Sequence, residues 1–439
     1  MNPVRLLVWL RVLPQGLVAT GTVRVVGVLV SFAAVVTLAR LLGPDGYGRY
    51  VYVLSVLNAL TFPVQSGLST LVVRETARAA QAHDWSLLAG LWRWTSRVIA
   101  CYAAFTAVVI AGALWFWHDS VSDTTLILII VGLPFVFCTP WAASRAAALS
   151  GLRRVALSRI VDDVLRPGLP IGIFVPIYFL LPTDQSAVWI AMATTSLASL
   201  LILLATTVLL QWLAPTEVIK APKTYCSSMW LKSLGPLALL GGMQLIMRYT
   251  DIVTLGFFVS SSDVGIYRTA SQCALPIGFA LQTINMVVGP NVARLHAAKD
   301  RRELQALVTW SARLAMAIAL PAAIVLILAG GAVLTLFFGP SYAAGHWALA
   351  IIAVGQLANV AAGPVGLVLN MSGHERDAMY GIAVGAGVNA GLNLALIPWI
   401  GIVGAAIATT VGLVTWNLLL WRTARGRAKV DCTALALSV

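Results

Sequence analysis

Apolar residues of this 439-residue chain are gathered in long segments that short polar turns separate. A segment of about 20 mostly apolar residues can cross a bilayer as an α-helix. Twelve such segments are predicted, at residues 16–40, 50–72, 95–117, 124–149, 160–181, 186–213, 233–259, 265–290, 305–330, 346–370, 379–399 and 401–422. The apolar stretch 331–339 is too short to cross, and we interpret it as a cap or re-entrant piece. The pattern predicts an all-α membrane protein with twelve transmembrane helices.

The composition supports a membrane protein and argues against a nucleic-acid-binding protein. Hydrophobic residues make up 59% of the chain, charged residues only 10%, and the mean hydropathy is +0.89, whereas soluble domains carry about 25% charged residues. The net charge of +13 could suggest a nucleic-acid partner. A nucleic-acid reader needs a basic face on a soluble module, and no loop is long enough to form one, so no such partner is expected.

The basic residues follow the membrane topology instead. All but five of the 29 lie on one side of the predicted topology, in alternate gaps, in the parts of the spans that adjoin those gaps, or near the two ends of the chain. The positive-inside rule makes that side cytoplasmic, which places both termini inside the cell. Because Arg24 interrupts the first apolar run and no small-residue cleavage site follows, we predict a retained span rather than a signal peptide. The five basic residues outside this pattern are Arg24, Arg40, Arg49, Arg248 and Arg268.

Twelve spans divide into two groups of six that begin on the same side. We predict an N-terminal lobe at 1–215, a cytoplasmic linker at 216–232, a C-terminal lobe at 233–424 and a cytoplasmic tail at 425–439. The matched turns Gly48–Tyr50 and Gly265–Tyr267 give weak support for an internal repeat. Two parallel repeats around a central cavity are an arrangement that secondary transporters use for alternating access.

Polar side chains recur at helical spacing along several predicted spans. Positions three or four apart share one helix face, and such polar faces are unfavourable against lipid. In the spans that also contain arginines or pack beside them, we predict a water-filled cavity. The candidate substrate-binding residues are Arg24, Asn58, Gln65, Gln244, Arg248, Arg268 and Gln272. For the stripes at 346–370 and 379–399, which glycines interleave, helix packing is the favoured interpretation.

The two arginines deepest in the predicted spans allow more than one interpretation. Arg24 has no acidic residue within four positions, so it either faces the cavity or extends to the membrane surface along its long side chain. Arg248 precedes Asp251 by three residues, so the two either neutralise each other or serve binding and coupling. The sequence leaves both questions open.

No enzymatic motif is visible in the chain. It contains no P-loop, no HExxH and no nucleophile elbow, and its five histidines are scattered. A glycosyltransferase would need a soluble nucleotide-sugar domain or a long acidic external loop, and neither is present. The five cysteines are an odd number and lie in spans or on the cytoplasmic side, so free thiols are expected. We predict a carrier without catalytic residues, metal or cofactor.

Three stretches of the sequence resemble a known transporter family. Leu38–Tyr50 resembles the first turn of Wzx-type polysaccharide flippases, and Gly67–Ser69 with Val73–Glu75 is similar to the end of their second span. Asn389–Asn393 and the segment from Ile397 to Thr409 are similar to their penultimate hairpin. These motifs indicate the superfamily of multidrug, oligosaccharidyl-lipid and polysaccharide (MOP) exporters.

The resemblance implies a function in polysaccharide assembly. It implies a flippase of the bacterial inner membrane that carries an undecaprenyl-pyrophosphate-linked oligosaccharide outward, with membrane lipids, a polysaccharide polymerase and other assembly proteins as partners. Arginine suits a pyrophosphate because it binds oxyanions bidentately. Arg24 and Arg248 are therefore the expected head-group residues, with Arg268 secondary and Asp251 as a coupling residue or charge partner.

Three alternatives remain. A multidrug exporter of the same superfamily would bind cations, and its proton-coupled members resemble a pattern with an acidic residue in the first span, where this chain has Arg24 and no carboxylate. A lipid II flippase related to MurJ typically has two further spans. A non-transporting scaffold would tolerate loss of the cavity arginines. The glycan, the energy source and the oligomeric state are not readable from the sequence.

Overall fold

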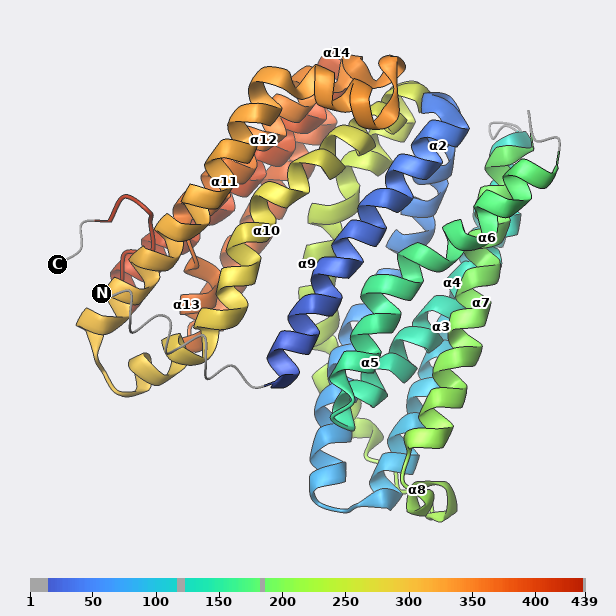
Figure 1. Cartoon of the computed structure of the whole chain (residues 1–439). Helices are drawn as coiled ribbons and strands as arrows, with labels where there is room; N and C mark the ends of the chain where they lie inside the picture. The colour runs from blue at the N-terminus through green and yellow to red at the C-terminus, as the bar shows by residue number, and fades with distance from the viewer. Residues whose placement is uncertain (1–14, 117–122, 182–185, 437–439) are drawn as a thin grey trace. The chain divides into compact units, whose positions relative to one another are not determined.

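The computed structural model describes residues 15–116, 123–181 and 186–436, and within these ranges the chain is built from helices without strands. The predicted all-α class is confirmed (Figure 1). The N-terminal helices are α2 (Gln15–Gln81), α3 (Trp85–Phe116), α4 (Asp123–Gly151), α5 (Val155–Arg159), η2 (Ile160–Leu165), α6 (Arg166–Leu180), α7 (Ala187–Leu213) and α8 (Thr216–Lys220). The remaining helices are α9 (Ser227–Phe258), α10 (Ser261–Ala297), α11 (Arg301–Phe338), η3 (Pro340–Gly345), α12 (His346–Ala362), α13 (Val365–Met371), α14 (Glu375–Thr423) and η4 (Ala424–Ala428).

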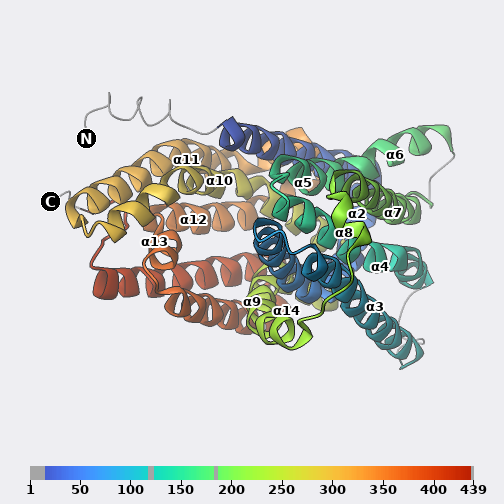
Figure 2. The same ribbon diagram turned by 90° about the horizontal axis from the view of Figure 1, so that it is seen from below.

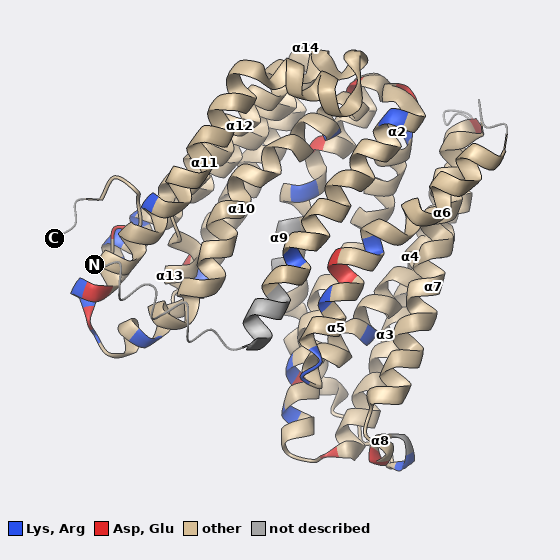
Figure 3. Cartoon of the chain, in the orientation of Figure 1, with Lys and Arg blue, Asp and Glu red and all other residues tan. Residues whose placement is uncertain are grey.

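Nine helices of the described chain are long and apolar enough to cross a membrane. Two of them, Gly21–Phe62 and Glu375–Ala428, each include residues of two predicted spans and the turn between them. Helix α9 covers the seventh predicted span. Long stretches of helix carry no charged residue, whereas some charged residues lie within helices around α5 and α9 (Figure 3). The chain is thus a multi-pass membrane protein, while the count of twelve spans stays a prediction.

Glycines make the turns inside these long helices. Gly43 breaks α2 with a φ of 66°, and Gly401 breaks α14 with a φ of 54°. A positive φ is costly for residues with a Cβ, so glycine is favoured at both sites. The two breaks coincide with the predicted turns after residues 40 and 399. At each break the chain changes direction, so that the second helical segment can pack beside the first.

The structure bears on two local predictions. Residues 330–338 follow a break at Ala329, where two helices meet at a kink within α11, and they end at Phe338. The interpretation of 331–339 as a cap or re-entrant piece stays a prediction. The predicted span 346–370 is interrupted, because Gly363 has a φ of 73° and Pro364 follows it. Hydropathy detects apolar length but not a break made by two residues, which explains this difference.

Contacts divide the described chain into two units, one ending at Leu245 and the other beginning at Ile246. We call them the N-terminal unit and the C-terminal unit. The division falls inside α9 rather than in the linker predicted at 216–232. The first half of α9 packs on α2, where a Cβ on Gly67 would lie 2.9 Å from the backbone nitrogen of Ala238. This close packing joins the start of α9 to the N-terminal unit.

Each unit has its own packed interior. In the N-terminal unit, α4 packs against both α2 and α7. In the C-terminal unit, α10, α11 and α12 pack against one another, and α12 packs on α14 (Figure 2). A core cluster there includes Val308, Leu369 and Leu420, all at most 2% exposed. Small residues let the helices approach closely, which gives the polar side chains described below fixed positions.

The segment after η4 folds back onto the helices of the C-terminal unit. Gln305 exchanges two hydrogen bonds with the backbone of Asp431, at 2.6 and 2.8 Å. The Asp431 carboxylate accepts hydrogen bonds from Trp421 Nε1 and from the backbone nitrogen and hydroxyl of Thr433. Val430 and Cys432 are at most 1% exposed. We call residues 429–436 the C-terminal tail, which is thus an integral part of this unit.

Electrostatics also hold the tail. Burial raises the pKa of the Asp431 carboxyl, but the hydrogen bonds from Thr433 and Trp421 and the charge of Arg425 outweigh burial, so its pKa lies below the usual value. Ionised Asp431 therefore stabilises the folded tail above the ordinary carboxyl pKa, and this contribution is lost as the pH falls through the lowered value. Burial also raises the pKa of the Cys432 thiol.

Close packing of the hairpin in α14 generates one prediction. A Cβ on Gly404 would lie 2.8 Å from the backbone carbonyl of Leu396, whereas a Cβ on Gly391 meets nothing within 4 Å. Gly404→Ala should lower the stability of the detergent-solubilised protein by about 1–3 kcal/mol because backbone must move. The matched variant Gly391→Ala should leave the thermal midpoint unchanged or raise it. Equal midpoints for the two variants would contradict the packing.

The tail generates a second prediction. Asp431→Ala removes the acceptor of three hydrogen bonds, so the tail should detach and expose Cys432. The rate of maleimide labelling at Cys432, followed by peptide mass spectrometry at pH 7, should rise at least about tenfold, as expected when about 1.4 kcal/mol of local stability is lost. Glu375→Ala, at an exposed acid, is the control. An unchanged labelling rate would show that Asp431 does not hold the tail.

Candidate functional site

A glycine contact in the N-terminal unit places Arg24 beside an acidic helix. A Cβ on Gly27 would lie 2.6 Å from both the Cβ and the carbonyl oxygen of Asp163, so α2 and η2 touch there. Arg24 lies three residues before Gly27 and thus on the same face of α2, and its side chain is half-buried. The charges of Arg159 and Arg24 both act on the Asp163 carboxylate. The fifth predicted span supplies the acidic neighbour that Arg24 lacks along the sequence.

The acidic segment is a π-helix, which is uncommon. η2 spans Ile160–Leu165 and carries Asp162 and Asp163. π-Helical turns are often found at functional sites because the extra residue changes the direction of side chains. Arg166 Nη2 lies 3.0 Å from Asp162 Oδ1, which leaves Asp163 as the carboxylate nearest to α2. Arg159, Asp162, Asp163 and Arg166 thus form a charged cluster, and the charge of Arg24 acts on it from α2.

A cavity of about 460 Å³ opens next to this cluster. We call it the N-terminal cavity, and its polar lining comes from α2, α4, α5, η2 and α6. The polar lining residues are Gln65, Ser66, Ser69, Ser150, Ser158, Arg159, Asp162 and Arg166. Two guanidinium groups among amide and hydroxyl groups can bind a phosphate and sugar hydroxyls. Of the predicted site residues, Gln65 lines this cavity.

Sequence reasoning missed Arg159 and Arg166 as cavity residues. It counted them among the basic residues of the cytoplasmic side. In a regular α-helix their spacing of seven residues would place both on one face, and this was the available signal. The polar stripe of α2 that faces them lies far away in the sequence, so the cavity itself became visible only in three dimensions.

The C-terminal unit contains a buried polar network that joins three helices. Tyr267 donates a hydrogen bond of 2.7 Å from its hydroxyl to Asp251 Oδ2, and the same hydroxyl lies 3.2 Å from Thr409 Oγ1. Asn389 Nδ2 contacts Thr409 at 3.4 Å, and Asn393 Nδ2 donates to Asn389 Oδ1 at 3.2 Å. Tyr267, Asn389 and Asn393 are at most 1% exposed. We call these five residues the C-terminal network.

The network changes the interpretation of the Arg248–Asp251 pair. The Asp251 carboxylate accepts hydrogen bonds from Tyr267 and from the backbone nitrogen of Ile252, and the charge of Arg268 acts on it. Arg248 is exposed and forms no ion pair with any side chain in the described ranges. Arg268, not Arg248, is thus the basic residue associated with Asp251. The three-residue spacing of Arg248 and Asp251 made an ion pair between them possible, but spacing alone does not show that the pair forms.

The other predicted site residues have varied surroundings. Asn58 donates from Nδ2 to the carbonyl of Leu54 on its own helix, at 2.7 Å. Gln272 is half-buried on α10, and the side chain of Gln244 lies outside those described. The amides of the spans at 346–370 and 401–422 meet across helices, where Asn417 donates to Asn359 at 3.0 Å. The helix-packing interpretation of that stripe agrees with this bond.

Comparison with solved structures defines the fold class. The chain is similar to the lipid II flippase MurJ in an inward closed conformation, with a TM-score of 0.73 and 13% identity over 93% of this chain and 87% of that one. It is also similar to an inward-facing MATE multidrug transporter of the MOP superfamily, with a TM-score of 0.72 and 16% identity over 93% and 98% of the two chains. The protein has the fold of MOP transporters, as the sequence motifs predicted.

A family model then assigns the chain more narrowly. Residues 37–345 match the model described as polysaccharide biosynthesis protein, and the chain belongs to that family. Two similar relatives come from Haloferax volcanii. They are the probable flippase AglR, at 29% identity over 41% of this chain and 38% of the relative, and the probable low-salt glycan biosynthesis flippase Agl15, at 22% over 39% and 36%. The matched region thus spans under two fifths of each relative.

The C-terminal network generates the third prediction. Tyr267→Phe removes the donor to Asp251 and leaves a carboxylate oxygen without its partner inside the bundle. The variant should lose about 1–3 kcal/mol of stability, measured as a lower thermal midpoint in detergent. Tyr380→Phe removes the hydroxyl of a tyrosine that is 68% exposed, and it should leave the midpoint unchanged. Equal midpoints for both variants would show that the network does not stabilise the fold.

Proposed function

We propose that this protein is a flippase that moves a lipid-linked oligosaccharide across the membrane during polysaccharide biosynthesis. The family supports a role in polysaccharide assembly, and two relatives carry the name flippase. The MOP fold is one on which alternating access operates. The proposal assigns no chemical step to the chain, so it acts as a carrier and not as an enzyme.

The observation that carries the proposal is the placement of arginines beside the polar stripe of α2. A lipid-linked glycan presents a phosphate or pyrophosphate, a set of sugar hydroxyls and a long apolar chain. Arg159 and Arg166 line the N-terminal cavity together with Gln65 and Ser69, and the charge of Arg24 acts on the neighbouring Asp163. Guanidinium groups bind the oxyanions bidentately, and amides and hydroxyls suit the sugar. This chemistry favours an anionic glycolipid over a cationic drug.

The finer assignment follows the resemblance stated above. The proposed substrate is an undecaprenyl-pyrophosphate-linked oligosaccharide of the bacterial inner membrane, for O-antigen, capsule or exopolysaccharide. Arg24 and Arg248 are the proposed head-group residues, with Arg268 secondary and Asn58, Gln65, Gln244 and Gln272 as sugar contacts. A polymerase and other assembly proteins would receive the flipped product.

Asp251 has a proposed role of its own. Its carboxylate is associated with Tyr267 and Arg268, so it positions Arg268 and serves as the charge partner in the C-terminal unit. A carboxylate inside a membrane protein is costly and is commonly functional. When a substrate phosphate approaches, the guanidinium of Arg268 can bind it in place of its interaction with Asp251, because arginine binds both carboxylates and phosphates.

The fourth prediction tests the arginines in cells. Arg24→Ala and Arg248→Ala should each reduce polymer export at least about tenfold in a strain that lacks the native gene, because a hydrogen bond to a charged group is worth about 1.5–3 kcal/mol. Arg24→Lys should restore part of the export, since it keeps the charge but not the bidentate geometry. Surface glycan is measured by immunoblot at matched membrane levels of the protein.

The control is Arg93→Ala, which removes an exposed arginine that the proposal does not use and should leave export intact. Full export by both Arg24→Ala and Arg248→Ala would exclude the head-group role. Accumulation of a lipid II-type precursor, with normal surface glycan, would instead assign the chain to cell-wall precursor export.

A further inference from the structure

A second cavity lies in the C-terminal unit, between the end of α14 and the C-terminal tail. Its volume is about 790 Å³, within the range of sites that bind lipid- or drug-sized molecules. Helices α11, α12 and α14 form its walls together with the tail. We call it the tail cavity. It shares no lining residue with the N-terminal cavity or the C-terminal network, and the transport proposal does not use it.

One side of the tail cavity is apolar and open. Val414 and Leu418 line it from α14, and Leu435 lines it from the tail. Leu418 is 52% exposed and Leu435 is 88% exposed, although both are strongly hydrophobic. Leu418 belongs to a helix that is apolar enough to cross a membrane. An apolar wall that is continuous with the lipid-facing surface of a span fits an acyl chain.

The other side of the cavity is basic. Arg425 and Lys429 line it, and both are exposed. The guanidinium carbon of Arg425 lies 5.6 Å from the centre of the Trp421 ring. This is a cation–π distance, and the interaction holds the guanidinium at the cavity wall. Both residues lie at the end of α14 that the positive-inside rule assigns to the cytoplasm. The basic side of the cavity is therefore at the level of lipid head groups.

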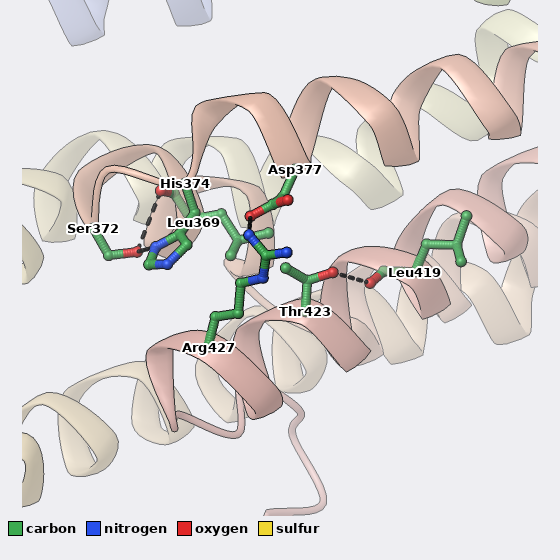
Figure 4. A network of polar contacts seen from close by, with 7 residues as sticks. All are labelled: Leu369, Ser372, His374, Asp377, Leu419, Thr423 and Arg427. Carbon is green, nitrogen blue, oxygen red and sulfur yellow. Dashed lines mark hydrogen bonds and ion pairs between the residues drawn. The ribbon is translucent and has the colours of Figure 1, made fainter.

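Neighbouring acidic residues offset this positive charge only in part. Arg427, between the two lining cations, is directed elsewhere and forms an ion pair of 2.8 Å with Asp377 (Figure 4). Asp431 also lines the cavity, and the charge of Arg425 acts on its carboxylate. Lys429 forms no ion pair with a residue of the described ranges. Two basic residues and one carboxylate give the cavity lining a net positive charge.

We propose that the tail cavity binds an anionic phospholipid of the cytoplasmic leaflet. The phosphate lies between Arg425 and Lys429, and an acyl chain runs along Val414 and Leu418. Basic pockets between transmembrane helices on the cytoplasmic side are a known way to recognise anionic head groups. A bound lipid would also contact the tail at Leu435 and so join the tail to α14. This binding is independent of whether the protein is a flippase.

The test uses the full-length protein purified in a neutral detergent. Short-chain phosphatidylglycerol and phosphatidylcholine are titrated separately and bound lipid is counted by native mass spectrometry. The native protein should bind phosphatidylglycerol at least about tenfold more tightly, as expected for two basic residues near a head group. The double variant Arg425→Gln, Lys429→Gln should lose this preference while its affinity for phosphatidylcholine stays unchanged.

Two further variants keep the outcome interpretable. Arg422→Gln removes an exposed arginine of the same helix end that does not line the cavity, and it should retain the preference. Ala358→Leu enlarges a lining residue of α12 and should weaken binding of both lipids without a change of charge. Thermal midpoints close to that of the native protein establish that the variants are folded.

Three results would overturn the proposal. They are equal affinity of the native protein for the two lipids, an unchanged preference in the double variant, and displacement of phosphatidylglycerol by an equimolar polyprenyl phosphate. The last result would assign the cavity to the transported lipid instead. Loss of export in Arg24→Ala with normal lipid binding would support the transport role without affecting this one.

Discussion

The cost of placing charge inside an apolar bundle is the constraint on which the rest of this structure depends. A charged side chain in a membrane span needs a partner or water. Arg24 meets the charge of Asp163 from another helix, and Asp251 accepts a hydrogen bond from Tyr267 within reach of the charge of Arg268. Each partnership crosses between helices. The charges therefore determine which helix faces must meet, in addition to any role in binding.

Backbone geometry provides the close approaches that these partnerships need. Gly27 brings α2 against the backbone of Asp163, and the π-helical turn of η2 directs the neighbouring carboxylates. Gly401 turns α14 so that Thr409 returns beside Asn389. A Cβ at position 27 would push α2 away from η2, and a residue other than glycine at position 401 would strain the turn at its positive φ. Polar groups left unpaired by such shifts would cost about 1–3 kcal/mol each. The small residues thus allow the close helix contacts that the polar networks require.

The tail illustrates how polar contacts extend the fold beyond its spans. The sequence predicts a cytoplasmic tail at 425–439 without indicating its contacts, whereas in the structure Gln305 and Trp421 hold Asp431 in place. The same contacts close one wall of a cavity that carries Arg425 and Lys429. A segment with no apolar periodicity becomes ordered because its backbone finds partners on helices that are distant in the sequence.

The sequence by itself determined the membrane class, the helical fold, the glycine turns near residues 43 and 401 and the superfamily. These properties depend on the local concentration of apolar residues, on backbone conformations that only glycine adopts easily, and on motifs that are contiguous in the chain. It also indicated Gln65 and the unusual position of Arg24.

Only the tertiary structure decided the partners. Asp163 is the partner of Arg24, and Arg268 is the basic residue associated with Asp251. The N-terminal cavity and the folded tail likewise bring together residues from different helices. Helical periodicity specifies which side chains share a face, but not which face of another helix lies opposite. That choice depends on the packing of the whole bundle, where shape and charge must be satisfied together.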